Sequence, residues 1–234
     1  MRRYRDLQKE CYEANLLLPR HGLIDLTFGN VSVADRGLGV FAIKPSGVDY
    51  RSLKPRDMVV VDLSGKTVAG RLKPSSDTPT HLRLFQAFTQ ARSVVHTHSR
   101  QATAFAQAGR PIPCLGTTHS DYFRGDIPVT RALTPREVAG DYERETGEAI
   151  VELFSRRDPA EIPAALVRHH GPFVWGPSGI KAVENALALE IVAGMALQAL
   201  RLAPRVRAIP SYLRDRHFLR KHGAKSYYGQ TASS

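Results

Sequence analysis

Residues 93–99 read Ser-Val-Val-His-Thr-His-Ser, a short apolar run that leads directly into two histidines. The run predicts a buried strand over residues 93–97. His96 and His98 are two positions apart, and residues i and i+2 of a strand project from the same face. Two neighbouring imidazoles at the end of a hydrophobic strand are costly to bury unless something binds them, and a divalent metal is the simplest occupant. An ordinary hydrogen-bonded histidine pair remains the alternative on this motif alone.

Strand and helix patterns alternate on both sides of this run. Helical spacing, capping residues and stop signals predict helices over residues 3–20, 77–88, 100–108, 134–154, 178–202 and 212–221. Short apolar runs predict further strands over residues 40–43, 58–63 and 164–167. This alternation predicts an α/β layered domain, and the tight turn at residues 64–66 favours a mixed or largely antiparallel sheet.

The composition is that of a soluble globular protein. The chain has 234 residues, 42% of them hydrophobic and 24% charged, with no internal repeat or composition break, which predicts one domain. Cys11 and Cys114 are too few and too far apart for a disulfide framework, so we expect packing roles in a reducing cytoplasm. Charged and amide residues interrupt the apolar stretch at residues 182–200, which predicts a buried helix rather than a membrane span.

The chain is strongly basic, with 33 Lys and Arg against 22 Asp and Glu, a net charge of +11. Such a charge suits nucleic-acid binding, because phosphate contacts dominate that affinity. Here, however, the arginines are dispersed, and no basic run is interleaved with stacking aromatics. We therefore expect no nucleic-acid partner, and a positive field that steers an anionic substrate.

Two further segments offer metal ligands. His170 ends a strand-like run and precedes Gly171-Pro172, a sharp turn that leaves its side chain at a strand end. His169 is an alternative, although along a strand it would face the opposite side. Asp77, at a helix start, offers an oxygen, with helix capping as its competing role. Three histidines and a movable carboxylate leave one position open, as a catalytic zinc requires.

Three short turns are candidates for binding a phosphate group. They are Phe28–Ser32, Lys44–Gly47 and Pro74–Ser76. Each offers backbone N–H groups and hydroxyls, and one adds a lysine, so together they predict an anion-binding site. Each alone is weak evidence, because turns contain Gly, Ser and Asn for backbone reasons.

A co-linear set of segments from about residue 7 to residue 230 resembles the class II aldolase/sugar-phosphate epimerase family. It comprises LTFGNVS, IKPSGVDY, KPSSDTPTH, VVHTHSR, GTTHSDYF, ETGEAIVE, HHGPFVWG and LRKHGAKSYYGQ. The resemblance implies a three-layer α/β/α domain with a central, largely antiparallel or mixed sheet. It also implies a zinc site on Asp77, His96, His98 and His170, which Mn²⁺ or Co²⁺ could also fill.

The resemblance further assigns roles to residues outside the metal site. It implies that substrate is bound by Gly29, Asn30, Lys44, Ser46, Gly47, Ser75 and Ser76, the serines and glycines chiefly binding its phosphate. Lys44 lies in the same lysine-bearing turn as in relatives. It implies Asp121 and Tyr228 as the acid/base pair, with Glu143 and His217 in supporting positions. Turn capping and tail packing are the competing roles of Asp121 and Tyr228. In the family this tyrosine lies on a C-terminal tail, here about residues 210–234, that reaches a neighbouring subunit's site, which implies a homotetramer.

The resemblance favours the epimerase branch of the family, because its aldolases typically carry glutamate where this chain has Asp77. The activity implied is zinc-dependent epimerisation at C4 of a ketopentose 5-phosphate by retro-aldol and aldol steps. The alternatives are an aldolase that releases its fragments and a binding module without chemistry, like the adducin head. Arg124 and Arg168 depart from the residues of close relatives. Neither departure removes a predicted metal ligand, so any effect they have is expected on the preference among pentulose phosphates.

Overall fold

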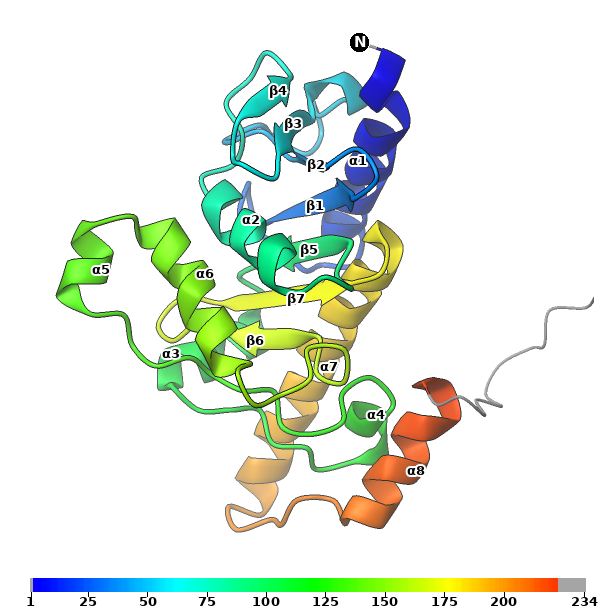
Figure 1. Cartoon of the computed structure of the whole chain (residues 1–234). Coiled ribbons are helices and arrows are strands. Elements are labelled where there is room, and N and C mark those ends of the chain that lie inside the picture. The colour runs from blue at the N-terminus through cyan, green and yellow to red at the C-terminus, as the bar shows by residue number, and fades with distance from the viewer. Residues whose placement is uncertain (1, 223–234) are drawn as a thin grey trace, which may run out of the picture.

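The computed structural model describes residues 2–222 and is built around one central sheet (Figure 1). The strands are β1 (Asn30–Asp35), β2 (Val40–Ile43), β3 (Val59–Asp62), β4 (Thr67–Ala69), β5 (Ser93–His96), β6 (Ala164–Leu166) and β7 (Pro172–Gly176). They form a seven-stranded sheet in the order β4-β3-β2-β1-β5-β7-β6, and each neighbouring pair is antiparallel. The prediction of a mixed or largely antiparallel sheet is therefore confirmed, and the antiparallel alternative is the one observed.

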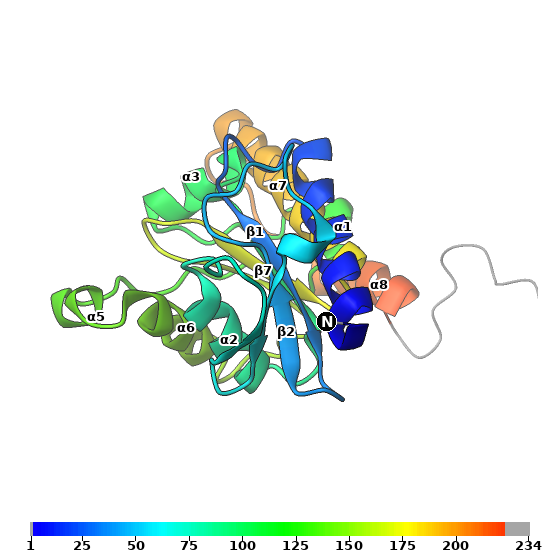
Figure 2. The ribbon, with the colours of Figure 1, turned by 90° about the horizontal axis from the view of Figure 1, so that it is seen from above.

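The helices cover both faces of the sheet, and 3-10 turns lie at η1 (Arg2–Tyr4) and η2 (Pro55–Asp57). They are α1 (Arg5–Arg20), α2 (Thr78–Ala87), α3 (Arg100–Ala108), α4 (Thr117–Ser120), α5 (Pro135–Ala139), α6 (Tyr142–Leu153), α7 (Gly179–Leu202) and α8 (Ser211–His222). Seen from above, α1, α3 and α7 lie on one face, and α2 and α6 lie on the other (Figure 2). This is the three-layer α/β/α arrangement.

The strands alternate between two hydrophobic cores, as the two-residue period of a strand requires. Val95 and Val174 pack with α1, α3 and α7, whereas their neighbours Val94 and Phe173 pack with α2 and α6. Cys11 and Cys114 are both free and buried. Since strands in the middle of the sheet are covered on both faces, nearly all of their side chains are buried.

Three strands were not predicted, and one predicted helix is wrong. Residues 28–32 were interpreted as a turn, but Asn30 begins β1, a central strand. The capping box at Thr134 is present, with the Thr134 hydroxyl accepting from the Glu137 N–H, but the helix it opens ends at Ala139. Gly140 interrupts the helix, and the Asp141 side chain caps a second helix by accepting from the Arg144 N–H. The segment 134–154 is therefore two helices, α5 and α6.

The antiparallel order gathers four strand ends at one edge of the sheet. Asn30, at the start of β1, pairs with His96, at the end of β5, and His96 pairs with Phe173 near the start of β7. On the other side of β1, Ser32 pairs with Ile43, so Lys44 follows at the same edge. Segments that are remote in sequence thus bring polar side chains to one place.

Over residues 2–222, we find no helix whose length and apolar character would allow it to cross a membrane.

Candidate active site

A pocket of about 330 Å³ lies at this edge of the sheet. It is lined by Thr27, Phe28, Gly29, Asn30, Lys44, Pro45, Ser46, Gly47, Ser75, Ser76, Asp77, His96, His98, Tyr142, Glu143 and His170. Every predicted metal ligand and every predicted substrate-binding residue is in this set. Glu143, predicted to have a supporting role, also lines the pocket.

Three histidine nitrogens converge in the pocket. The Nε2 atom of His98 lies 3.1 Å from the Nε2 atoms of both His96 and His170. One donor nitrogen from each of the three rings lies within 4.8 Å of the others. Nitrogens bound tetrahedrally to one zinc at about 2.0–2.1 Å are about 3.3–3.4 Å apart, so this spacing fits a shared cation.

The two histidines of the His-x-His pair face the same pocket, as predicted. The strand β5 ends at His96, however, so His98 lies beyond it. The placement of His170 has a different cause from the one predicted. His170 lies in the turn between β6 and β7, and its N–H donates to the Val167 carbonyl. His169, whose φ of 64° is unusual for a residue with a side chain, is exposed. The turn, rather than strand alternation, therefore separates the two histidines.

Contacts on the outer side of two imidazoles orient them. The Nδ1 atom of His96 lies 3.0 Å from the Pro172 carbonyl oxygen, and the ring stacks on Phe173 with centroids 4.2 Å apart. The Nδ1 atom of His170 lies 2.9 Å from the Tyr142 hydroxyl. When Nδ1 donates outward, Nε2 keeps its lone pair for the centre of the pocket.

The electrostatics of the pocket also suit a cation. Burial, and then the neighbouring His96, lower the pKa of His98 below its ordinary value. Burial, followed by His96 and His98, lowers the pKa of His170 to about 4. Both imidazoles are therefore neutral at pH 7, which is the form that binds a metal.

Asp77 lines the pocket but does not cap α2 through its side chain. Its carboxylate instead accepts from the Asn30 amide at 2.6 Å and from the Ser75 hydroxyl at 3.4 Å. Burial raises the pKa of Asp77, but His96, His81 and the Asn30 hydrogen bond outweigh burial and leave this pKa below its ordinary value. The predicted competing role as a helix cap is wrong for the side chain, and the carboxylate lies outside the cluster of three histidine nitrogens.

The lysine and serine turns lie side by side. Ser46 N–H donates to the Lys73 carbonyl, and Ser75 N–H donates to the Lys44 carbonyl, so residues 44–46 and 73–75 are paired. Lys44 is only 2% exposed, and its ammonium lies 4.7 Å from the centroid of the Tyr50 ring. Burial lowers the pKa of Lys44, although the Asp49 charge partly opposes the shift. A buried lysine beside serine hydroxyls is suited to an anionic group.

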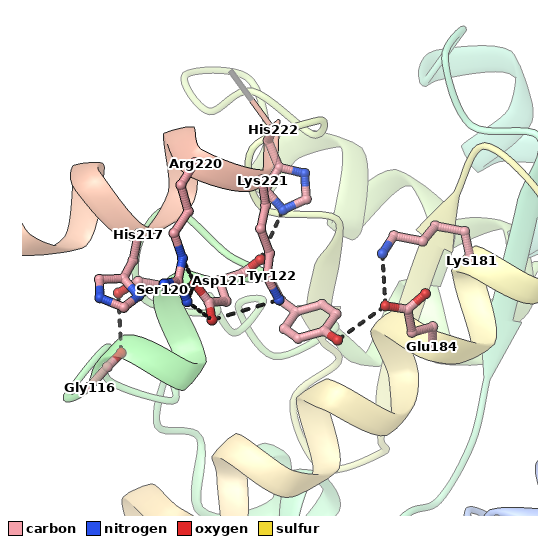
Figure 3. Close-up of polar contacts among 10 residues, drawn as sticks. All are labelled: Gly116, Ser120, Asp121, Tyr122, Lys181, Glu184, His217, Arg220, Lys221 and His222. Atoms are coloured by element: carbon pink, nitrogen blue, oxygen red, sulfur yellow. Dashed lines mark hydrogen bonds and ion pairs between the residues drawn. The ribbon is translucent and has the colours of Figure 1, made fainter. Parts of the chain in front are cut away.

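Asp121 lies in a different place, where α4 meets α8 (Figure 3). Its carboxylate accepts from Arg220 at 2.7–3.1 Å, from His217 at 3.1 Å, and faces Lys221 at 3.7 Å. Burial raises the pKa of Asp121, but the hydrogen bonds from Arg220 and His217 and the charge of Lys221 outweigh it and leave this pKa below its ordinary value.

The surroundings of Asp121 place it away from the histidines of the same chain. The adjacent Tyr122 donates to Glu184 of α7 and lines a second pocket, of about 420 Å³. That pocket also includes Ala91 and Gly176, which lie at the opposite ends of β5 and β7 from His96 and Pro172. The structure brings the supporting residue His217 to Asp121, but brings neither of them to the histidine pocket. Tyr228 lies outside the described residues.

Comparisons with known proteins agree with this geometry. The model of the "Class II Aldolase and Adducin N-terminal domain" family matches residues 9–197. The chain belongs to this family. Class II aldolase family members that it resembles include the L-ribulose-5-phosphate 4-epimerase UlaF of Salmonella paratyphi B, which is 53% identical over 224 residues, 96% of this chain and 98% of that protein.

Solved structures of the class II aldolase family share the fold. An L-fuculose 1-phosphate aldolase superposes with a TM-score of 0.76 and is 25% identical, over 91% of this chain and 94% of that one. The L-fuculose-1-phosphate aldolase of Thermus thermophilus superposes with a TM-score of 0.65 and is 28% identical, over 85% of this chain and 97% of that one. Class II aldolases are metal-dependent, and the three histidines of this chain offer a site for a metal ion.

The sequence analysis gave no role to Tyr142 or Arg220. Both make their contacts, with His170 and Asp121 respectively, only through the tertiary fold. Arg220 lies within one of the segments quoted for the resemblance, but that segment alone does not show that it meets Asp121. The two departures from close relatives have structural roles instead. Arg124 pairs with Glu161 and Asp215, and the Arg168 guanidinium packs against Gly109, so neither lines the histidine pocket.

Proposed function

We propose that this chain is an L-ribulose-5-phosphate 4-epimerase that interconverts L-ribulose 5-phosphate and D-xylulose 5-phosphate. The observation that carries the proposal is one pocket in which three converging histidines lie beside a buried lysine and paired serine turns. The 53% identical relative named as this epimerase supports the choice of substrate. We also propose that residues 1–234 form a single domain.

The metal in this proposal is zinc, held by His96, His98 and His170 with Asp77 as the fourth ligand. Neutral imidazoles and a nearby carboxylate are a donor set that zinc prefers, although Mn²⁺ or Co²⁺ also accept it. When bound, the ion supplies Lewis acidity to the oxygens at C2 and C3 of the sugar. For Asp77 to join the site, its carboxylate must exchange the Asn30 contact for the ion.

The phosphate of the substrate would lie against Lys44 and the serine turns. Ser46, Ser75 and Ser76 offer hydroxyls. Gly29 and Gly47 have positive φ, and because glycine has no side chain the backbone there can approach a ligand closely. Asn30 Oδ1 is buried without a hydrogen-bond partner among the described residues, so it is available to a substrate hydroxyl. A firm hold on the phosphate keeps a cleaved fragment in the pocket.

Epimerisation at C4 requires a carbon–carbon bond to break, because the C4 hydrogen is not α to the C2 carbonyl. One acid/base group removes the proton from the C4 hydroxyl, the C3–C4 bond breaks, and its electron pair stays with the C1–C3 fragment. The glycolaldehyde phosphate fragment rotates, and the C3–C4 bond forms again on the opposite face of its aldehyde carbon. A second group then returns the proton to the new C4 oxygen.

Asp121 and Tyr228 are the proposed pair, and both would come from a neighbouring subunit. Asp121 is tied to α8 through Arg220 and His217, and α8 leads directly into the tail that carries Tyr228. A tail that reaches the neighbouring pocket would therefore take Asp121 and His217 to it as well. Glu143 lines the pocket from within the same chain. A homotetramer built in this way would complete each site from two subunits.

The proposal is tested by turnover of L-ribulose 5-phosphate to D-xylulose 5-phosphate by the purified chain, after chelation and after zinc is restored. We expect activity only with the metal. Release of free dihydroxyacetone and glycolaldehyde phosphate in place of the epimer would identify an aldolase, the second candidate. A chain that binds zinc tightly but turns over no pentulose phosphate would refute the proposal.

A further inference from the structure

We propose that Tyr142 is a positioning residue for the metal site: its hydroxyl accepts the Nδ1 hydrogen of His170 and thereby fixes Nε2 as the metal-binding atom. The hydroxyl oxygen lies 2.9 Å from Nδ1, within normal hydrogen-bond distance. The two rings are nearly parallel, with centroids 6.2 Å apart and an angle of 14° between their planes. The inference rests on the metal site of the proposed function.

The tautomer follows from the other side of the ring. His170 Nε2 lies 3.1 Å from His98 Nε2, in the group of nitrogens that face one another. A neutral imidazole has one donor and one acceptor nitrogen, so a lone pair on Nε2 requires the hydrogen on Nδ1. The Tyr142 oxygen is the acceptor placed to receive that hydrogen.

His170 needs such a partner more than His96 does. His96 lies in β5, where backbone pairing fixes the main chain and the Pro172 carbonyl receives Nδ1. His170 lies in a turn outside the sheet, next to His169 with its positive φ. A side-chain hydrogen bond is therefore the contact that sets the direction of the His170 ring.

Tyr142 is itself held firmly. Because α5 ends before Gly140, Tyr142 is the first residue of α6 and does not lie in the middle of one long helix. The α6 helix packs against α2: Thr80 donates to the Glu143 carbonyl, and Arg83 pairs with Glu148 at 2.8 Å. These contacts place the start of α6 beside the start of α2, where Asp77 lies.

The test compares zinc affinity in the wild-type chain, Tyr142→Phe and a control, Tyr12→Phe, which makes the same change at a partly buried tyrosine of α1. Phenylalanine keeps the ring against His170 and removes only the hydroxyl. Loss of an outer hydrogen bond to a ligand histidine costs about 10- to 100-fold in metal affinity. We expect that loss for Tyr142→Phe and none for Tyr12→Phe, measured by competition with a chromophoric chelator.

The visible spectrum of the Co²⁺-loaded proteins gives a second readout, because it reports ligand geometry independently of turnover. We expect a changed spectrum for Tyr142→Phe, with the metal-free proteins unfolding at the same urea concentration. Wild-type affinity and an unchanged cobalt spectrum in Tyr142→Phe would overturn the inference. A wild-type chain that binds neither Zn²⁺ nor Co²⁺ would instead overturn the metal site of the proposed function.

Discussion

Gly29 lies against the backbone of His96, so closely that a β-carbon on Gly29 would be 2.7 Å from the His96 carbonyl oxygen. Its φ of +83° is also a value that side chains disfavour. Gly29 therefore lets the loop before β1 pass directly over a candidate metal ligand. No other residue type fits this position without moving one of the two segments.

Gly29→Ala is expected to destabilise the fold by more than about 2 kcal/mol, because it adds a backbone clash to the strain of positive φ. The matched control is Gly39→Ala, at a φ of +65° with no heavy atom within 4 Å of the added carbon. That change should cost only about 1 kcal/mol. Urea unfolding of the metal-free proteins measures both values, and equal losses would contradict the proposed clash.

The proposal that each site is shared between subunits predicts complementation. His96→Asn removes a metal ligand and Asp121→Asn removes an acid/base group, so each variant alone should be inactive. A homotetramer re-formed from a 1:1 mixture should regain activity at roughly a quarter of its sites, where an intact His96 meets an intact Asp121 of a neighbour. The control is a mixture of the two variants kept under conditions in which subunits do not exchange, and it should stay inactive. If re-formed tetramers also stay inactive, Asp121 does not act in a neighbouring subunit's site.

Tyr228→Phe is expected to reduce epimerisation severely while leaving zinc content unchanged, because a phenyl ring cannot transfer a proton. Metal analysis and turnover are measured on the same preparation. Near-normal turnover would exclude Tyr228 from the acid/base pair.

Lys44→Gln is expected to raise KM for the phosphorylated substrate by about 10- to 100-fold, the effect of losing a charged hydrogen bond of about 1.5–3 kcal/mol. The exposed Lys66 supplies the control, Lys66→Gln, which should leave KM unchanged. The measurement is initial rate against L-ribulose 5-phosphate concentration. An unchanged KM in Lys44→Gln would remove this lysine from the phosphate contacts.

Acid should destabilise the fold in part through His119. Burial lowers the pKa of this residue to about 4, and its Nε2 lies 2.7 Å from the Gly125 carbonyl oxygen. The unfolded chain, with a pKa near 6.5, binds this proton more readily, so stability falls as pH drops from about 6.5 to 4. The loss reaches about 3 kcal/mol below that range.

His119→Gln keeps a donor for Gly125 but cannot titrate. The difference in unfolding free energy between wild type and His119→Gln should therefore shift by about 3 kcal/mol between pH 7 and pH 4. Measuring both proteins with a chelator present removes any contribution of metal binding, and taking the difference cancels the other titrating groups. Parallel pH profiles would contradict the assignment.

Sequence patterns correctly predicted the helices and strands that are determined by residues close together in the chain. The apolar run Val40–Ile43 became β2 with the expected bounds, and Gly109 ends α3 in the left-handed conformation expected of a stop signal. By contrast, β1 was missed because Ser32 is a polar residue buried in a central strand, where its hydroxyl lies 2.7 Å from His81 Nδ1. That burial depends on a partner 49 positions away, which no short window contains.

In the candidate site, too, features set by nearby residues were predicted, and features set by residues remote in sequence were not. The histidines were predicted because residue type and spacing are themselves the chemical signal. The pairing of residues 44–46 with 73–75, which gathers the serine turns, comes from the sheet and is invisible in either segment alone. The contacts of Asp121 with His217 and Arg220 likewise depend on the docking of α4 on α8, which neither segment alone reveals.

His98 and His170 are 72 positions apart, yet their Nε2 atoms are 3.1 Å apart in the folded chain. In the proposed metal site, an ion bound by both residues would act as a removable cross-link between the end of β5 and the β6–β7 hairpin. Since the unfolded polypeptide does not hold these nitrogens together, saturating metal favours the native state, by about 4 kcal/mol at a thousand times Kd. Metal supply in the cell would then govern how long the enzyme survives heat and proteolysis, in addition to its turnover.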